Sequence, residues 1–361
     1  MNRSISQENP PVRAPFGELF THHMVTAGWT AESGWAPLRL RPFDSLPMSP
    51  AMVGLHYSQV VFEGLKAYRR DHGVIEVFRP TDHAARLNRS AQRLAMPPLP
   101  EDKFLTAIDL LVAADQECLS ADPGLSLYLR PLLYASEANL ALRPAREYTF
   151  VLIAFVTGGF FSDKPSPVTV WVNRDYPRAA PGGTGGVKFA GNYAPSYLAQ
   201  EKAQQAGCHQ VVWLDPMERR WVEELGGMNL FFVRGSGPGA QLITPPHTGT
   251  LLPGITRDSV MRLAPGLGYQ VREEPVSVDQ WRSECREGTI TETFACGTAA
   301  VVTPVGTVRD GEKTWQVGTG AAGAVTLAMR DALTSVHDGR APAPEGWLRT
   351  VPPAGAVAGQ A

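Results

Sequence analysis

A proline- and glycine-rich stretch near the middle of the chain divides the sequence into two parts. It covers residues 175–186 and contains two prolines and four glycines, a composition typical of a connection between domains. The chain has 361 residues, and a single hydrophobic core rarely grows beyond about 250–300 residues. We therefore expect a small N-terminal α/β domain over residues 1–174, an interdomain loop over 175–186 and a large C-terminal domain over 187–361.

The composition indicates a folded protein without a nucleic-acid-binding surface. Hydrophobic residues make up 43% of the chain and charged residues 19%, and the net charge is only -2. Residues 1–14 lack the apolar core of a secretory signal. The most apolar stretch, residues 150–161, is shorter than the roughly 20 residues of a membrane-spanning helix, so we expect a buried strand there. The four cysteines form no CxxC pair, and no metal-ligand spacing occurs, which favours a cytoplasmic protein with an organic cofactor and no metal.

Both parts of the chain mix predicted strands and helices without strict strand–helix alternation. Thr81 is a candidate cap for a helix that ends before Pro97, and Pro195 begins a helix that Gly207 ends. We expect an α+β or mixed α/β fold of two domains, with the site in the crevice between them. Further expected strands cover residues 74–78, 125–134, 148–156, 210–214, 229–233 and 289–294, and further expected helices cover 102–114, 257–264 and 324–337.

Lys188 directly follows the proline- and glycine-rich stretch, in a segment of small or apolar residues, Val187–Tyr193. Burying a free ammonium group is costly unless the group is paired, deprotonated or made covalent. A lysine amine in such surroundings can attack a carbonyl carbon. A solvent-exposed lysine in a glycine-rich loop explains this segment equally well, so other segments must decide between the two interpretations.

Three other segments offer groups for binding the phosphate of a carbonyl cofactor. Arg86 lies on a predicted helix with Arg89 and Arg93 one and two turns further on, which predicts a basic face. The turn Pro253–Gly254 directly precedes a predicted helix, whose first N–H groups can bind an anion. The segment Cys296–Ala299 follows a strand and offers a hydroxyl group. A solvated helix face and ordinary turns remain the simpler interpretations of these three segments.

Two acids, Glu223 and Glu224, precede a Gly-Gly turn between two predicted strands. Acids in such a place are usually solvated. A buried carboxylate against a pyridine nitrogen would instead keep that nitrogen protonated and strengthen the ring as an electron sink.

Eight segments of the chain resemble the branched-chain amino acid aminotransferases, which are pyridoxal-phosphate enzymes of fold type IV. The segments follow one another in the order of that family over about 280 residues. They are FTHHM (20–24), LHYSQVVFEGLKAY (55–68), FRPTDHAARLNRSAQRL (78–94), SLYLRPLLY (126–134), VKFAGNYAPSYLAQ (187–200), VEELGGMNLFFV (222–233), ITPPHTGTLLPGITRDSV (243–260) and TETFACGTAA (291–300).

The resemblance implies a role for each matching position. Lys188 would form a Schiff base with the aldehyde of pyridoxal 5′-phosphate and then act as the acid–base group. Arg86 would bind the phosphate, Tyr193 would contact the ring hydroxyl and Glu224 the ring nitrogen. Ile255, Thr256 and Thr298 would complete the phosphate site. The substrate side would be shaped by Tyr57, Phe62, Tyr128 and Arg130, with the main chain of Thr298 and Ala299 holding the substrate carboxylate.

The activity implied by the resemblance is transamination of L-leucine, L-isoleucine and L-valine with 2-oxoglutarate, by a ping-pong route in a homodimer. The sequence departs from the family pattern at two places. Ala300 and Thr303 stand where some members carry a CxxC redox pair, so we expect no thiol switch there. Gly227 stands where many members have threonine, so no side-chain contact is expected from this position.

Three alternatives stay open on the sequence. A D-amino acid aminotransferase or an aminodeoxychorismate lyase would share the fold type and change the reaction. The segment Gly318–Gly323 fits the GxGxxG pattern of a nucleotide-binding oxidoreductase, but Asp338 falls at the end of a predicted helix and too little chain follows for a second strand. A catalytically silent binding protein is disfavoured by the lysine, glutamate and arginine set.

Overall fold

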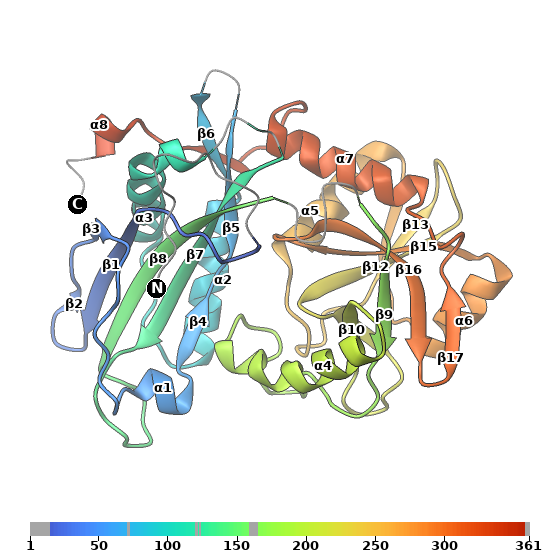
Figure 1. Ribbon diagram of the computed structural model, residues 1–361, viewed down its shortest axis with the longest axis horizontal. Coiled ribbons are helices and arrows are strands. Elements are labelled where there is room, and N and C mark those ends of the chain that lie inside the picture. The colour runs from blue at the N-terminus through green and yellow to red at the C-terminus, as the bar shows by residue number, and fades with distance from the viewer. Residues whose placement is uncertain (1–14, 71–72, 120–121, 123, 159–164, 358–361) are drawn as a thin grey trace. The chain divides into compact units, whose positions relative to one another are not determined.

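The described part of the chain forms two compact units (Figure 1). This computed structural model describes residues 15–70, 73–119, 122, 124–158 and 165–357. Within that part, one unit contains residues 15–158, 187–191 and 337–357, and the other contains 165–186 and 192–336. The first unit thus includes the Lys188 segment, which the expected domain limits had assigned to the second part. Those limits stay a prediction.

An antiparallel sheet of nine strands forms the first unit. Its order is β18-β6-β5-β7-β8-β1-β2, and β3 pairs with β1 and β4 with β7. The two longest strands, β7 and β8, are almost wholly buried, which confirms two of the expected strands. The strands are β1 (His23–Thr30), β2 (Gly34–Trp35), β3 (Arg39–Pro42), β4 (Val60–Phe62), β5 (Leu65–Arg69), β6 (Ile75–Phe78), β7 (Ser126–Ala135), β8 (Glu147–Thr157) and β18 (Leu348–Thr350).

The helices of this unit are α1 (Val53–Tyr57), α2 (Pro80–Arg93), α3 (Glu101–Ala114) and α8 (Ala354–Val357), with a 3-10 turn over Gln116–Cys118. α2 begins with Pro80, whose fixed φ and missing N–H suit the first helical position. The expectation that Thr81 caps this helix is wrong, because Arg79 is the N-cap residue and Thr81 lies inside the first turn.

The segment after α7 is joined to the sheet of the first unit. Thr350 belongs to β18, which pairs with β6, and the Val351 N–H donates to the Ile75 carbonyl at 2.9 Å. The expected buried strand over 150–161 is found in β8 up to Thr157, and its last residues lie outside the described part.

A closed ring of strands forms the second unit, in the order β11-β10-β9-β16-β15-β12 with β12 pairing back to β11. Within the ring itself every strand has a neighbour on both sides. β13 and β14 extend the sheet beyond β12, and β17 pairs with β16. The strands are β9 (Val168–Val172), β10 (Gln210–Leu214), β11 (Val222–Leu225), β12 (Met228–Arg234), β13 (Gln241–Thr244), β14 (Gln270–Glu273), β15 (Ile290–Gly297), β16 (Val301–Asp310) and β17 (Lys313–Gln316).

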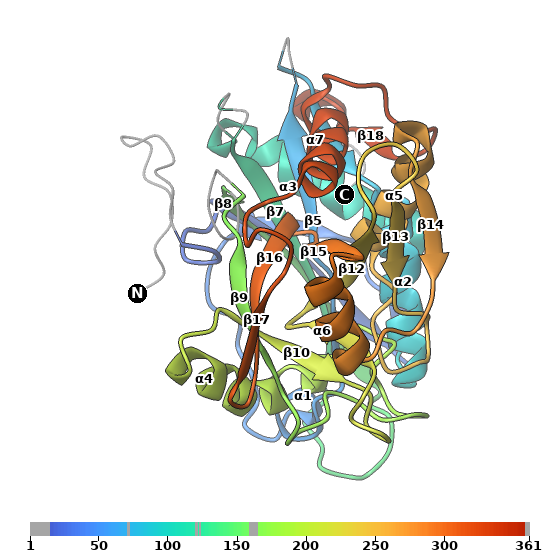
Figure 2. The same ribbon diagram turned by 90° about the vertical axis from the view of Figure 1, so that its right-hand side faces the viewer.

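Four α-helices pack on this ring: α4 (Tyr197–Gln205), α5 (Ile255–Leu263), α6 (Val278–Glu287) and α7 (Ala324–Asp338). A 3-10 turn over Ala194–Ser196 leads into α4, as the proline predicted, and Gly207 follows its end with φ +70°. α6 lies beside β15 and β17 (Figure 2), and its Trp281 is fully buried. No helix in the described part has the length and apolar character needed to cross a membrane.

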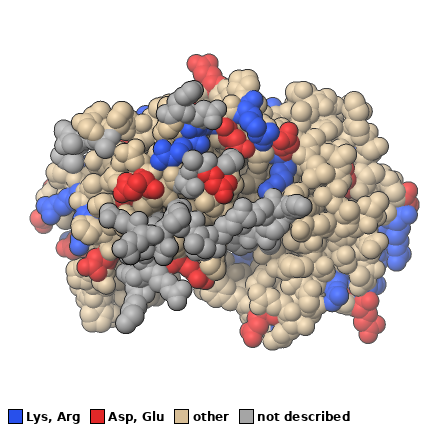
Figure 3. Space-filling model, turned by 45° about the horizontal axis from the view of Figure 1, so that its top comes forward, with Lys and Arg blue, Asp and Glu red and all other residues tan. Residues whose placement is uncertain are grey.

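On the face of the molecule drawn in Figure 3, basic and acidic side chains lie interspersed among uncharged ones. This distribution agrees with the near-zero net charge of the chain.

Candidate active site

Lys188 is held at its main chain by two elements of the first unit. The Phe62 N–H of β4 donates to the Lys188 carbonyl at 3.2 Å, and the Lys188 N–H donates to Ser90 Oγ of α2 at 2.9 Å. Val61 and Phe189 form an isolated antiparallel bridge beside them. The Lys188 side chain is half-buried, with Nζ 4.9 Å from the centre of the Phe62 ring. The lysine therefore lies in a fixed segment and not in a free surface loop.

Arg86 is buried on the same helix and binds a carboxylate that the sequence analysis did not single out. Its Nε lies 2.7 Å from Glu63 Oε1 and its Nη2 2.8 Å from Glu63 Oε2. The expected basic face does not form, because Arg89 and Arg93 are exposed while Arg86 is 4% exposed. The turn of the helix thus buries one of the three arginines and leaves the other two in solvent.

His83 shares the Glu63 carboxylate, with its Nδ1 2.7 Å from Oε2. Burial alone would raise the pKa of Glu63, but Arg86 and His83 hold it well below its usual range. Burial lowers the pKa of His83, and Glu63 only partly offsets this effect. His83 is therefore neutral near pH 7, and its Nδ1 carries the proton because an ionised carboxylate can only accept.

Three of the predicted substrate residues form one cluster in the first unit. The Arg130 guanidinium lies 5.0 Å from the Phe62 ring centre and 5.4 Å from that of Tyr128. Tyr128 also stacks on Phe155, with 4.9 Å between ring centres. Arg130 Nε is buried and has no hydrogen-bond partner among the described residues. A buried cationic donor of this kind is suited to an anionic ligand.

Tyr57, the fourth predicted substrate residue, lies apart from this cluster. Its side chain is 46% exposed, and its hydroxyl donates to the Leu140 carbonyl at 2.9 Å. It lines a pocket of about 290 Å³ together with Leu142, Arg143 and Phe189, among others. Phe62, Tyr128, Arg130 and Lys188 do not line this pocket.

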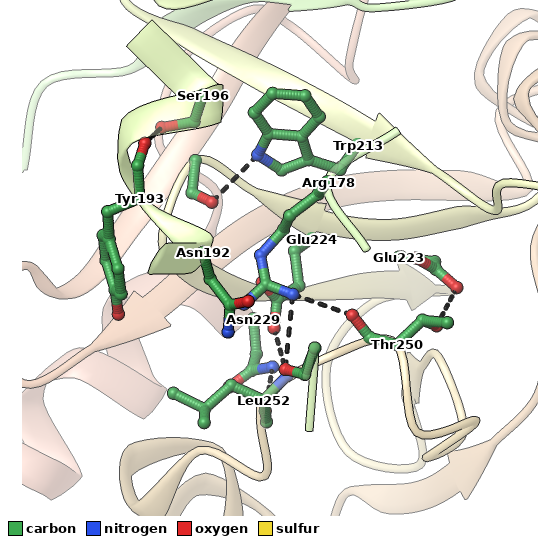
Figure 4. A network of polar contacts seen from close by, with 12 residues as sticks. Arg178, Asn192, Tyr193, Ser196, Trp213, Glu223, Glu224, Asn229, Thr250 and Leu252 are labelled. Carbon is green, nitrogen blue, oxygen red and sulfur yellow. Dashed lines mark hydrogen bonds and ion pairs between the residues drawn. The ribbon is translucent and has the colours of Figure 1, made fainter. Parts of the chain in front are cut away.

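Glu224 is a buried carboxylate of the second unit (Figure 4). It is 2% exposed, its Oε2 lies 2.8 Å from Arg178 Nε, and its Oε1 accepts from the Leu252 N–H at 2.6 Å. Arg178 also donates through Nη1 to the Thr250 carbonyl at 2.7 Å. Arg178 belongs to the proline- and glycine-rich stretch, and the sequence analysis missed it because its partner lies 46 positions further on in the chain.

Glu223 is also buried, contrary to the usual behaviour of acids beside a turn. It accepts a hydrogen bond from the Thr250 hydroxyl and another from the Thr248 hydroxyl at 3.5 Å. Burial raises the pKa of Glu223 above its usual value.

The strand register of the second unit places three predicted groups near one another. Asn229 on β12 pairs with Glu224 on β11 and with Cys296 on β15, and its Nδ2 donates to the Leu252 carbonyl at 3.0 Å. Leu252 is followed by the Pro253–Gly254 turn, and Gly254 is the N-cap of α5. Ile255 and Thr256 are the first residues of α5, and Thr298 and Ala299 lie half-buried in the turn after β15.

Tyr193 is half-buried at the start of the 3-10 turn before α4, and its carbonyl accepts from Ser196 Oγ at 2.6 Å. Figure 4 shows its ring apart from the Arg178–Glu224 pair. Apart from Tyr57 and Tyr193, the predicted residues thus form one group in each unit, and Glu63, His83, Ser90 and Arg178 join them. Of these four residues only Glu63 had a local sequence signal, as an acid inside the apolar run Val61–Leu65.

Residues 60–308 match the family model of amino-transferase class IV. The chain belongs to this family. A probable branched-chain-amino-acid aminotransferase of Streptomyces coelicolor is 50% identical, over 93% of this chain and 92% of its own. The branched-chain-amino-acid aminotransferase of Mycobacterium tuberculosis is 47% identical over 95% and 94%. The crystal structure of the Escherichia coli branched-chain amino acid aminotransferase has a TM-score of 0.74 and 29% identity, and covers 90% of this chain and 99% of that chain.

These similarities confirm the resemblance to branched-chain amino acid aminotransferases and the fold class, fold type IV. They also exclude the nucleotide-binding alternative. In the structure, Gly318–Gly323 precede α7, and Asp338 is the last residue of that helix rather than the end of a second strand.

The cofactor of class IV aminotransferases is pyridoxal 5′-phosphate, which confirms the expected cofactor. A similar structure, the branched-chain amino acid aminotransferase of Thermobaculum terrenum in its pyridoxal-phosphate form, has a TM-score of 0.70 and 28% identity, and covers 90% of this chain and 98% of that chain. The described side chains fit such a group chemically. Buried Arg86 and the first N–H groups of α5 suit a phosphate, buried Glu224 suits a ring nitrogen, and the Lys188 amine suits an aldehyde.

Proposed function

We propose that this protein transfers the amino group of L-leucine, L-isoleucine and L-valine to 2-oxoglutarate, with Lys188 as the residue that binds the cofactor covalently. The observation that carries the proposal is the placement of Lys188. Its main chain is bonded on both sides, to Phe62 and Ser90, and its amine lies over an aromatic ring. A reacting amine needs such a fixed position, because small displacements are costly in rate.

In this proposal each remaining residue has a separate task. Arg86 and the main chain at Ile255 and Thr256 bind the phosphate, with Thr298 completing the site. Glu224 bonds the ring nitrogen, and Tyr193 the ring hydroxyl. When bound, the cofactor supplies an electron sink that stabilises negative charge at the substrate α-carbon. The Lys188 amine, released when the substrate amino group takes its place on the cofactor, would accept the substrate α-proton at Nζ and pass a proton to the cofactor carbon that had been joined to it.

The substrate side must accept both an aliphatic side chain and a carboxylate. Phe62 and Tyr128 present apolar ring faces. One methylene in an apolar pocket is worth only about 1–3 kcal/mol, so all three branched substrates are expected to be used. Arg130, whose buried Nε has no partner among the described residues, suits the second carboxylate of 2-oxoglutarate. The main chain of Thr298 and Ala299 binds the α-carboxylate of each substrate. One site then serves both substrates in turn, and the first product leaves before the second substrate binds.

Reduction with borohydride followed by peptide mapping tests the role of Lys188. We expect the cofactor label on the peptide that contains Lys188. Lys66, which is 4% exposed on β5, is the control position, and a label there would overturn the assignment. Turnover of L-leucine with 2-oxoglutarate, compared with turnover of D-alanine, separates the proposed reaction from that of a D-amino acid aminotransferase.

We also propose that the protein is a cytoplasmic homodimer. Three exposed apolar side chains of the first unit lie together: Tyr57 (46%), Leu140 (48%) and Leu142 (88%). The Tyr57 hydroxyl donates to the Leu140 carbonyl, and Tyr57 lines one pocket with Leu142, so these three residues form an apolar patch, and such patches support association. The four cysteines form no disulfide, which suits a reducing compartment.

A further inference from the structure

A buried polar cluster lies where β4 meets α2 in the first unit. Glu63 is 0% exposed, His83 1%, Arg86 4% and Ser90 0%. The three helix residues follow one another at intervals of three and four, so they share the face of α2 that is turned to the protein interior. Charged groups are rarely so deeply buried, and this cluster therefore calls for a physical reason.

The Glu63 carboxylate receives hydrogen bonds from three different residues. Arg86 donates through Nε at 2.7 Å and Nη2 at 2.8 Å, His83 through Nδ1 at 2.7 Å, and the Gly64 N–H at 3.1 Å. Two parallel N–H···O bonds from one guanidinium define the plane of the group as well as its place. The carboxylate thus determines how Arg86 is oriented.

Folding stability by itself does not account for this cluster. Removing two charges from water costs about as much as their attraction returns, and apolar replacements of a buried ion pair are often neutral or stabilising. The gain is a defined geometry around Arg86.

The same cluster is bonded to the segment that carries the lysine. Ser90 Oγ donates to the Arg86 carbonyl at 2.9 Å and accepts from the Lys188 N–H at 2.9 Å. Phe62, which directly precedes Glu63, donates from its N–H to the Lys188 carbonyl at 3.2 Å. Glu63 is therefore part of the framework that relates the Arg86 guanidinium to the Lys188 main chain.

We propose that Glu63 is a positioning residue, which orients the Arg86 guanidinium for the phosphate of the cofactor and is itself held by His83. This inference rests on the phosphate role of Arg86 in the proposed function. The alternative is neutralisation, in which the acid beside Arg86 cancels part of its charge and weakens phosphate binding. Positioning and neutralisation predict changes of opposite sign when the carboxylate is removed.

The test compares the affinity of the apoenzyme for pyridoxal 5′-phosphate with its affinity for pyridoxal, which lacks the phosphate, by equilibrium dialysis. Glu63→Gln removes the charge, and Glu63→Asp keeps the charge but withdraws the carboxylate by one methylene. We expect each variant to raise the dissociation constant of pyridoxal 5′-phosphate at least about tenfold, and that of pyridoxal less than about threefold. Asp82→Asn is the matched control, because Asp82 lies on the same helix and its carboxylate is 44% exposed.

Unchanged or tighter binding of pyridoxal 5′-phosphate by both variants would overturn the positioning role. An equal rise in the dissociation constants of pyridoxal 5′-phosphate and pyridoxal would also overturn it, because a residue with a merely structural role affects the binding of both ligands alike. If Glu63→Gln does not fold, as judged by circular dichroism, Glu63→Asp is read by the same criteria. Arg86→Ala separates the two proposals: if it fails to weaken pyridoxal 5′-phosphate selectively, the phosphate role of Arg86 is wrong. If Arg86→Ala weakens the binding of pyridoxal 5′-phosphate selectively but neither Glu63 variant does, only the positioning role of Glu63 is wrong.

Discussion

At the scale of single residues, two buried carboxylates of this protein have defined cationic or hydrogen-bonding partners. Glu63 binds Arg86 and His83 in the first unit, and Glu224 lies against Arg178 in the second. An ion removed from water without a partner costs several kcal/mol, by an order-of-magnitude estimate. Each of these pairs therefore holds one proposed cofactor-binding side chain in a single orientation. The neighbours Glu63 and Arg178 are as important to the site as the residues that are proposed to touch the cofactor.

The Arg178–Glu224 pair leads to a prediction of stability. Arg178→Met leaves the Glu224 carboxylate buried without its cation, so we expect the free energy of unfolding to fall by about 3–5 kcal/mol in urea titrations. Arg262→Met is a suitable comparison, because both members of the Arg262–Asp258 pair are exposed, at 60% and 41%, and exposed pairs are worth at most about 1 kcal/mol. Equal losses in the two variants would contradict the importance of burial.

At the scale of secondary structure, local patterns identified most elements but not all of their ends. The periodic apolar residues of 102–114 and 324–337 predicted α3 and α7 almost to the residue. Thr81 was a misleading signal, since a hydroxyl residue near a helix start caps it only when its backbone is extended. α2 begins at Pro80 with Arg79 as its N-cap, two residues before the expected cap. Ser277, in contrast, caps α6, and its Oγ accepts from the Gln280 N–H at 3.1 Å.

This difference between the two hydroxyl residues can be measured. Ser277→Ala removes a cap at a buried helix start and should lower the free energy of unfolding by about 0.5–2 kcal/mol. Thr81→Ala should change it by less than about 0.5 kcal/mol, because Thr81 is exposed and caps nothing among the described residues. Thermal or urea unfolding of both variants checks the prediction, and a larger loss for Thr81→Ala would show that α2 begins differently from the structure.

At the scale of the whole molecule, the two units differ in whether their strands form a closed ring or an open sheet. The second unit closes β11-β10-β9-β16-β15-β12 into a ring, and the first keeps an open antiparallel sheet. The first unit also carries the exposed apolar patch of Tyr57, Leu140 and Leu142. Open surfaces of this kind are stabilised by association.

The proposed homodimer is tested at this patch. Leu142→Asp places a charge on the most exposed leucine of the patch, and burying a leucine side chain is worth about 1.5–3 kcal/mol. We therefore expect the dimer dissociation constant to rise at least about tenfold, as measured by light scattering over a concentration series. Met217→Asp is the control, because Met217 is 77% exposed in the second unit, outside the patch. A monomeric wild-type protein, or equal effects of both variants, would contradict the proposal.

The sequence alone was sufficient to identify the family, the cofactor and most strands and helices, because these depend on local periodicity and on motifs whose residues are close together in the chain. It also singled out Lys188, as a lysine among small and apolar residues. Only the tertiary structure paired Glu63 with Arg86, Arg178 with Glu224, and the Lys188 main chain with Ser90. Local patterns predict which face of a strand or helix is buried, but the partner across the interior depends on how distant segments pack. For that reason the proposed contacts with the cofactor could be read from motifs, whereas the residues that orient those contacts could not.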